Sequence, residues 1–289
     1  MDWIEASVQV DGEAAEAVSQ VINRYVPGGA VIEQDPNAPD NLTVKVFLPP
    51  DSHETQRKIK EGLWHLGQIY PIPEPRFRLL PHQEWAEVWK NHFQVLRIGP
   101  HVVIKPSWLT HSPASGDIVI ELDPGMAFGT GLHPSTRLCV RALQDIIQPG
   151  MQVLDLGTGS GILAIAAALM GAGQVMALDV DELAVKAATT NVKANGVADR
   201  VQVELGSIEQ LPAGTVSFDL MLVNIVADVI LTLVNQGLLS YLASGGWFVG
   251  AGVLDSQASD VLAALAGKGL CEVQMRRERD WVALVGRMA

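Results

Sequence analysis

A glycine-rich segment in the middle of the chain has the residue types that most directly suggest chemistry. Asp155-Leu-Gly-Thr-Gly-Ser-Gly161 follows an apolar stretch typical of a strand and precedes one typical of a helix. Its glycines let the backbone turn tightly and let a ligand approach where a Cβ would intrude, and amides at a helix N-terminus face such a ligand. The next strand ends at Asp179, whose carboxylate can accept hydrogen bonds from both ribose hydroxyls of a nucleoside. The segment therefore predicts a nucleoside-binding turn.

The glycine spacing alone leaves two classes of cofactor open. Gly159, Gly161 and Ala164 also satisfy the dinucleotide fingerprint G-x-G-x-x-G/A, so a dinucleotide-dependent oxidoreductase is an alternative, although no nicotinamide pocket with a proton donor is recognisable. Asp155 favours S-adenosylmethionine instead, because an acidic residue would be unfavourable beside a pyrophosphate. We expect Asp155 to help hold the cationic methionine end of the cofactor, directly or through water, next to the loop that contains Gly159.

A second glycine-rich segment, Asp123-Pro-Gly-Met-Ala-Phe-Gly-Thr-Gly-Leu-His-Pro-Ser-Thr136, lies upstream. Gly129, Thr130 and Gly131 are expected to close over a ligand. Ser135 and Thr136 are expected to cap the helix that follows, which leaves open whether they also contact the ligand.

A buried strand, Phe218-Asp-Leu-Met-Leu-Val-Asn224, ends in an amide side chain. The carboxyl ends of the strands are where open α/β sheets bind their ligands. The side-chain oxygen of Asn224, with nearby backbone carbonyls, can accept hydrogen bonds from an amine and orient its lone pair. We therefore predict a catalytic role for Asn224, with a simple helix cap as the alternative.

The elements that position these residues alternate between strand and helix from Met151 onward. Near-continuous apolar strands between amphipathic helices predict a parallel sheet covered on both faces. The last two strands are expected to flank a charged turn, Arg276-Arg-Glu-Arg-Asp280, and this hairpin should add an antiparallel edge. The expected strands are Gln152–Leu156, Gln174–Leu178, Val201–Glu204, Phe218–Asn224, Gly246–Val249, Cys271–Met275 and Trp281–Gly286, with helices beginning near Gly161, Asp181, Ala227 and Ser256.

The first part of the chain has the periodicities of a β-α-β-β-α-β order, which is typical of a small α+β ferredoxin-like domain over residues 1–80. Residues 81–97 carry Trp85, Trp89 and Phe93 at helical spacing. This stripe predicts a linker helix or one that merely packs on a domain, and the large domain then covers residues 98–289. The expected small-domain segments are Trp3–Val10, Gly12–Tyr25, Gly28–Glu33, Leu42–Leu48, His53–Leu66 and Pro75–Leu80.

Composition narrows the class of protein. A net charge of −12 argues against binding naked nucleic acid, because phosphates require a basic face. The same charge would attract a basic protein, or would simply keep the protein soluble. Two distant cysteines predict neither a disulfide framework nor a metal site, and no secretory signal or membrane span is recognisable, so we expect a cytoplasmic location.

Taken together, the segments resemble the ribosomal protein L-eleven methyltransferase (PrmA) family. The resemblance covers nearly the whole chain, and its most specific part is the segment from Asp123 to Thr136. It implies a Rossmann-like, seven-stranded S-adenosylmethionine methyltransferase domain behind a small substrate-recognition domain. It also implies that cofactor contacts come from Thr136, Gly157, Asp179 and Asn224.

The resemblance further implies an acceptor, the amino groups of ribosomal protein L-eleven: lysine ε-amines and the N-terminal α-amine. The Asn-Pro-Pro-Tyr motif of other amine and amide methyltransferases is absent, since the strand continues as Asn224-Ile-Val226. His133 is a candidate base, but we favour deprotonation by water with Asn224 aligning the amine. Another protein or a small amine as acceptor, and a non-catalytic ribosome-assembly factor, remain as alternatives.

Overall fold

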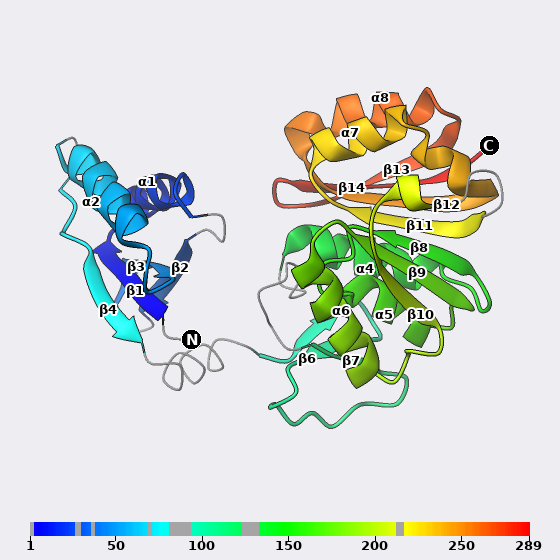
Figure 1. Cartoon of the computed structure of the whole chain (residues 1–289), viewed down its shortest axis with the longest axis horizontal. Helices are drawn as coiled ribbons and strands as arrows, with labels where there is room; N and C mark the ends of the chain where they lie inside the picture. The colour runs from blue at the N-terminus through cyan, green and yellow to red at the C-terminus, as the bar shows by residue number, and fades with distance from the viewer. Residues whose placement is uncertain are drawn as a thin grey trace. The chain divides into compact units, whose positions relative to one another are not determined.

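The computed structural model describes residues 3–26, 30–35, 38–68, 71–80, 94–122, 133–211 and 217–289. The chain divides into two compact units, Met1–Phe93 and Gln94–Ala289 (Figure 1). The aromatic stripe of the predicted linker helix, Trp85, Trp89 and Phe93, lies outside the described residues. Each unit has its own hydrophobic core.

The N-terminal unit consists of a four-stranded antiparallel sheet and two helices. Its strands lie in the order β2-β3-β1-β4. Val8 of β1, Val18 of α1 and Ile59 of α2 belong to one core, so both helices cover the same face of the sheet. The order of elements is the expected one, and the ferredoxin-like class stays a prediction. The elements are β1 (Trp3–Val10), α1 (Gly12–Asn23), β2 (Val31–Asp35), β3 (Ala38–Leu48), α2 (His53–Gly67) and β4 (Arg76–Leu80).

The C-terminal unit is built on a seven-stranded sheet of order β10-β9-β8-β11-β12-β14-β13. The first five strands are parallel, and β14 runs antiparallel to β12 and to β13. The predicted parallel sheet with an antiparallel hairpin at its end is therefore confirmed. The strands are β8 (Gln152–Leu156), β9 (Gln174–Asp179), β10 (Val201–Leu205), β11 (Phe218–Asn224), β12 (Leu242–Leu254), β13 (Leu270–Glu278) and β14 (Trp281–Met288).

The charged segment at the final hairpin is mostly strand, contrary to the expected turn. Arg276, Arg277 and Glu278 pair with β14, which leaves Arg279 and Asp280 for the turn. Charged side chains are tolerated in this strand because β13 is an edge strand whose side chains reach solvent.

Helices cover both faces of the large sheet (Figure 1). One core unites α4, α5 and α6, and a second core unites α7 and α8 on the opposite face. These helices are α4 (Pro134–Ile146), α5 (Ile162–Leu169), α6 (Glu182–Ala194), α7 (Ala227–Asn235) and α8 (Ala258–Ala266), with short 3-10 turns η1 (Ile208–Gln210), η2 (Leu238–Tyr241) and η3 (Asp255–Gln257). The parallel strands are therefore buried from both sides, as their continuous apolar sequences indicate.

A three-stranded sheet precedes the large one and was not predicted. It consists of β5 (Leu96–Ile98), β6 (Val102–Lys105) and β7 (Ile118–Glu121), in that order. Ile98 is fully buried in the same core as α4 and α5. The predicted linker helix therefore does not extend to residue 97, because Leu96 and Arg97 pair with β6 instead.

Among the described residues, Asp155 is the one charged residue that is buried in the core. It is only 1% exposed, and its Oδ2 accepts hydrogen bonds from Thr158 Oγ1 at 2.6 Å and from the Ala164 amide at 3.1 Å. Burial raises the pKa of this carboxyl to about 6; the charge of Asp179 adds to the rise, and the two hydrogen bonds oppose it.

Asp155→Asn is expected to change how stability depends on pH. An unfolded-chain aspartate has a pKa of about 3.9, so between about pH 4 and pH 6 the folded protein binds more protons than the unfolded chain. The wild-type free energy of unfolding should therefore fall as the pH rises through this window, and the variant should lack this component. Urea unfolding at pH 4 and pH 7 measures it, with surface Asp260→Asn as control. If the difference in the free energy of unfolding between wild type and Asp155→Asn were the same at pH 4 and pH 7, the raised pKa would be contradicted.

Candidate active site

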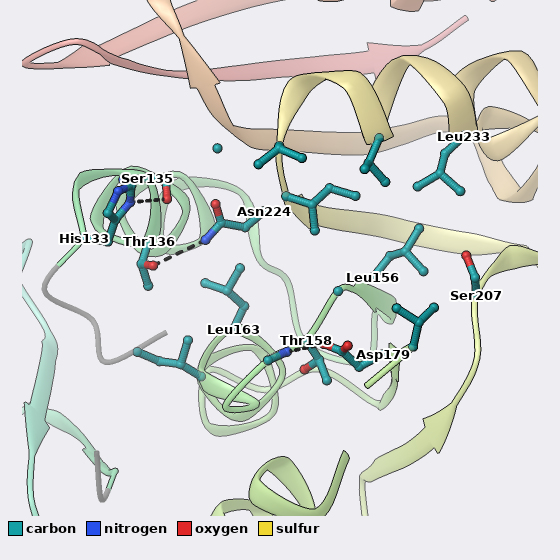
Figure 2. A pocket seen from close by; sticks show the side chains of 18 of the residues that line it. His133, Ser135, Thr136, Leu156, Thr158, Leu163, Asp179, Ser207, Asn224 and Leu233 are labelled. Atoms are coloured by element: carbon teal, nitrogen blue, oxygen red, sulfur yellow. Dashed lines mark hydrogen bonds between the residues drawn. The ribbon is translucent and has the colours of Figure 1, made fainter. Parts of the chain in front are cut away.

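A cavity of about 640 Å³ lies at the carboxyl ends of the central parallel strands. β8 lies between β9 and β11. The strands that follow β8 in the chain are first added on one side of it, as β9 and β10, and then on the other side, beginning with β11, so the strand order reverses at β8. Open α/β sheets bind their ligands in the crevice outside such a reversal, and the cavity volume is typical of small-molecule sites. Figure 2 shows side chains that follow β8, β9 and β11 around this cavity.

The glycine loop forms one wall of the cavity and is tied to the neighbouring strand. The amides of Gly157 and Thr158 both donate to the Leu178 carbonyl, at 2.8 and 3.0 Å. The Gly159 amide donates to Asp179 Oδ2 at 2.8 Å. Gly161 then caps α5 in the left-handed conformation. These bonds tie the loop between β8 and α5 to the end of β9 through protein groups alone.

Asp179 ends β9 and lines the cavity beside the loop. Its Oδ2 holds Gly159, and its Oδ1 accepts from the Asp181 amide at 3.1 Å. Each carboxylate oxygen can accept more than one hydrogen bond. The carboxylate is thus oriented by the backbone and keeps acceptor capacity for a polyol such as a ribose.

Asn224 ends β11 on the opposite wall and faces Thr136 from α4 (Figure 2). Its Nδ2 donates to Thr136 Oγ1 at 3.3 Å, and Thr136 is fully buried. Its Oδ1 is buried and has no hydrogen-bond partner among the described residues. A buried acceptor without a partner costs about 1–3 kcal/mol, so this oxygen is suited to a hydrogen-bond donor on a ligand.

The first turn of α4 corrects the predicted cap. The N-cap is His133, whose Nδ1 accepts from the Ser135 amide and lies 2.7 Å from Ser135 Oγ. Pro134 occupies the first helical position, which requires an extended residue before it, and this moves the cap ahead of Ser135 and Thr136. Thr136 is therefore turned toward Asn224 rather than capping the helix.

The His133 ring forms another part of the cavity wall together with Trp281 of β14. The two rings meet edge to face, with centroids 4.4 Å apart. Burial lowers the pKa of His133 below its ordinary value, and the charge of Arg137 lowers it further. Both effects favour the neutral imidazole.

Ile225 lies between two glycines at the cavity wall. A Cβ at Gly157 would come within 2.4 Å of Ile225 Cγ2, and a Cβ at Gly252 within 2.4 Å of the Ile225 carbonyl oxygen. Both glycines have positive φ angles, +74° and +82°. The segment after Asn224 can approach the glycine loop only because neither position has a side chain.

The structure brings most of the predicted site residues together. Thr136, Gly157, Gly159, Asp179 and Asn224 line the cavity, whereas Gly129 and Thr130 lie outside the described residues. Asp155 does not line the cavity, because its carboxylate lies beneath the loop and bonds to Thr158 and Ala164. Its direct or water-mediated contact with a cofactor stays a prediction.

Several lining residues were not predicted. They are distant in sequence from the glycine segment and belong to loops, to helix α7 or to strands: Ser207, Val226, Val229, Gly252 and Trp281. Trp281 could have been singled out from the sequence as a candidate lining residue, since it is a large aromatic residue directly after the charged segment. The valines had none, because apolar residues at helical spacing are equally typical of a core.

The described residues contain no group of three or more histidine, cysteine or acidic side chains that could hold a metal ion. Within the same residues, none of the helices has the length and apolar character needed to cross a membrane.

Comparison with known proteins identifies the family. The model of the ribosomal protein L11 methyltransferase (PrmA) family matches residues 2–289. The ribosomal protein L11 methyltransferase of Chloroflexus aurantiacus is 43% identical, covering 99% of this chain and 98% of the relative, and that of Herpetosiphon aurantiacus is 37% identical over 99% of each.

A solved structure, that of a ribosomal protein L11 methylase from Lactobacillus delbrueckii subsp. bulgaricus, superimposes with a TM-score of 0.63 at 32% identity. The superposition covers 68% of this chain and 100% of the Lactobacillus chain. The predicted Rossmann-like methyltransferase domain is thereby confirmed, and the chain belongs to the ribosomal protein L11 methyltransferase (PrmA) family.

Proposed function

We propose that this chain transfers methyl groups from S-adenosylmethionine to lysine ε-amines and the N-terminal α-amine of ribosomal protein L11. Members of the family are S-adenosylmethionine-dependent methyltransferases, and its relatives are named for this ribosomal protein. The observation that carries the proposal is Asn224 Oδ1, a buried acceptor without a partner among the described residues, on the wall opposite Asp179. The two residues suit an amine and a ribose respectively.

Residues on both walls would hold the cofactor. Asp179 would accept hydrogen bonds from the ribose hydroxyls, and Gly157 and Gly159 would contact the cofactor from the loop. Thr136 and Asn224 would contact it from the opposite wall, and all five residues line the cavity. Gly129, Thr130 and Asp155 remain further candidates. The bound cofactor supplies a methyl group already activated on a sulfonium, so the main contribution of the protein is proximity and orientation.

The acceptor amine must be neutral, although the reference pKa of lysine is about 10.4. The predominantly apolar cavity disfavours the ammonium form and lowers that pKa. Asn224 Oδ1 then accepts an N–H of the amine and aims its lone pair. We assign the deprotonation to water. Among the described lining residues Asp179 and His133 are titratable, but Asp179 holds the loop and His133 Nδ1 lies against Ser135.

We assign recognition of the substrate protein to the N-terminal unit and the reaction to the cytoplasm, with no direct contact to nucleic acid. In support, Trp64 of α2 is 62% exposed and lines a groove of about 580 Å³ with residues 72–75. Exposed tryptophans are frequent anchors of protein interfaces. The net charge of −12 is suited to a basic partner.

Incubation with labelled S-adenosylmethionine and ribosomal proteins that lack the modification is expected to label ribosomal protein L11. Mass spectrometry of the labelled band then locates the methylated amines. Label on another protein or on a small amine would retain the chemistry and overturn the acceptor. Cofactor binding without transfer to any ribosomal protein would favour a non-catalytic assembly factor.

Asn224→Ala is expected to lower kcat/KM for methylation by about 10²-fold, the cost typical of a misplaced reactant. Steady-state kinetics with the methyl acceptor measures the effect. Asn235→Ala is the matched control, since Asn235 is exposed at the end of α7, the helix that follows the same strand. Unchanged cofactor affinity and unchanged rate in the Asn224 variant would remove this residue from the mechanism.

Asp179→Asn is expected to weaken S-adenosylmethionine binding about 10- to 100-fold, because hydrogen bonds to a charged group contribute about 1.5–3 kcal/mol. Equilibrium dialysis with labelled cofactor measures it. Asp181→Asn makes the same change two residues later at the cap of α6, where asparagine is an equally good cap, and should bind normally. Displacement of the label by NAD at similar concentration would favour the dinucleotide alternative.

A further inference from the structure

The final hairpin carries a cluster of charged residues that the proposed function does not use. β13 continues to Glu278, and β14 begins at Trp281, so these two residues flank the tight turn at the end of the hairpin. Arg279 in this turn has a φ of +54°. The turn therefore presents a carboxylate and an indole from two adjacent strands.

Glu278 binds two arginines of α4 through its two oxygens. Its Oε1 accepts from Arg137 Nε at 2.6 Å and also contacts a terminal guanidinium nitrogen of Arg137. Its Oε2 accepts from Arg141 at 2.9 Å. The side chains of Glu278 and Arg137 are each 19% exposed. Charge-assisted hydrogen bonds of this kind are stronger than neutral ones and are less screened when they are partly buried.

The same hairpin touches the start of α4 at a second point. Trp281 packs edge to face on His133, the N-cap of α4. Arg137 directly follows Thr136, which is fully buried and bonded to Asn224. The first turn of α4 is thus contacted by the hairpin at His133 and Arg137, on either side of the residue that reaches into the cavity.

We propose that Glu278 is a positioning residue for the active site: it fixes the first turn of α4 and so keeps Thr136 against Asn224. The proposal rests on the function proposed for these two residues. Glu278 itself does not line the cavity. Its effect is transmitted through Arg137, and a small shift of this turn would move Thr136 Oγ1 out of hydrogen-bond range of Asn224.

The test is Glu278→Gln, which keeps the shape of the side chain and removes its charge. The expected result is an approximately tenfold rise in the Kd for S-adenosylmethionine, equivalent to about 1.4 kcal/mol, with a fall in kcat at saturating cofactor. Asp145→Asn is the matched control, because Asp145 at the far end of α4 pairs with Arg276 of the same strand at 2.5 Å. This control should change neither Kd nor kcat.

Two further variants separate positioning from general stability. In the double variant R137Q/E278Q the two effects should not add, because both residues act through one ion pair. Arg141→Gln removes the more exposed of the two arginines that bind Glu278 and should produce a smaller change in the same direction. This variant provides the test if E278Q does not fold. Melting temperatures of all variants are measured in parallel.

A lowered melting temperature in E278Q with normal cofactor affinity and kcat would overturn the proposal, and so would equal effects of E278Q and D145N on affinity. The proposed function fails separately: if Asn224→Ala and Thr136→Val leave affinity and rate unchanged, the site assignment is wrong whatever E278Q does.

Discussion

The loop after β8 depends on main-chain hydrogen bonds to the end of β9. Two of its amides share the Leu178 carbonyl, and a third donates to the Asp179 carboxylate. Asp179 therefore has two tasks, since the side chain that faces the cavity also shapes the loop beside it. Asp155 supports the same loop from below through Thr158 and Ala164. One wall of the cavity is consequently preorganised as a unit, which lowers the entropic cost of binding a ligand.

The other wall is assembled from segments far apart in the chain. Asn224 meets Thr136 across 88 residues, and Glu278 meets Arg137 across 141. The antiparallel end of the sheet thus has a function beyond completing the core, because it contacts the helix that contributes Thr136. Closing contacts between residues this far apart in the sequence costs conformational entropy in the unfolded chain.

Sequence patterns located the wall formed by the glycine loop and Asp179 more completely than the opposite wall. The bounds of β8 and β11 were predicted to the residue, because each is a mostly apolar run that ends in a polar side chain or a glycine turn. β12 is longer than predicted, since Ser244 to Gly246 interrupts its apolar pattern while the strand continues. β5 was assigned to a helix because three residues are too few to show a period of two.

Side-chain environments were the harder part to predict. The contact of Asp155 with a cofactor stays a prediction, but its burial beneath the glycine loop was not expected from its charge. The cap of α4 was assigned to Ser135 or Thr136 from residue preference, although Pro134 moves it to His133. The burial of Asp155 depends on how the loop is threaded between elements, which local sequence preferences do not specify. The cap, in contrast, had a local signal in Pro134. Trp281 reaches the cavity only through the register of the last two strands.

Ile225 limits which parts of the cavity wall can change during evolution. Its side chain takes up the volume that a Cβ at Gly157 would need, and its carbonyl takes up that of a Cβ at Gly252. A side chain at Gly157 would therefore require the Ile225 side chain to move, and a side chain at Gly252 would meet the Ile225 backbone itself. Val226 and Val229 line the same cavity but are 62% and 44% exposed. Substitutions at these two positions can therefore alter the cavity surface without crowding the glycine loop.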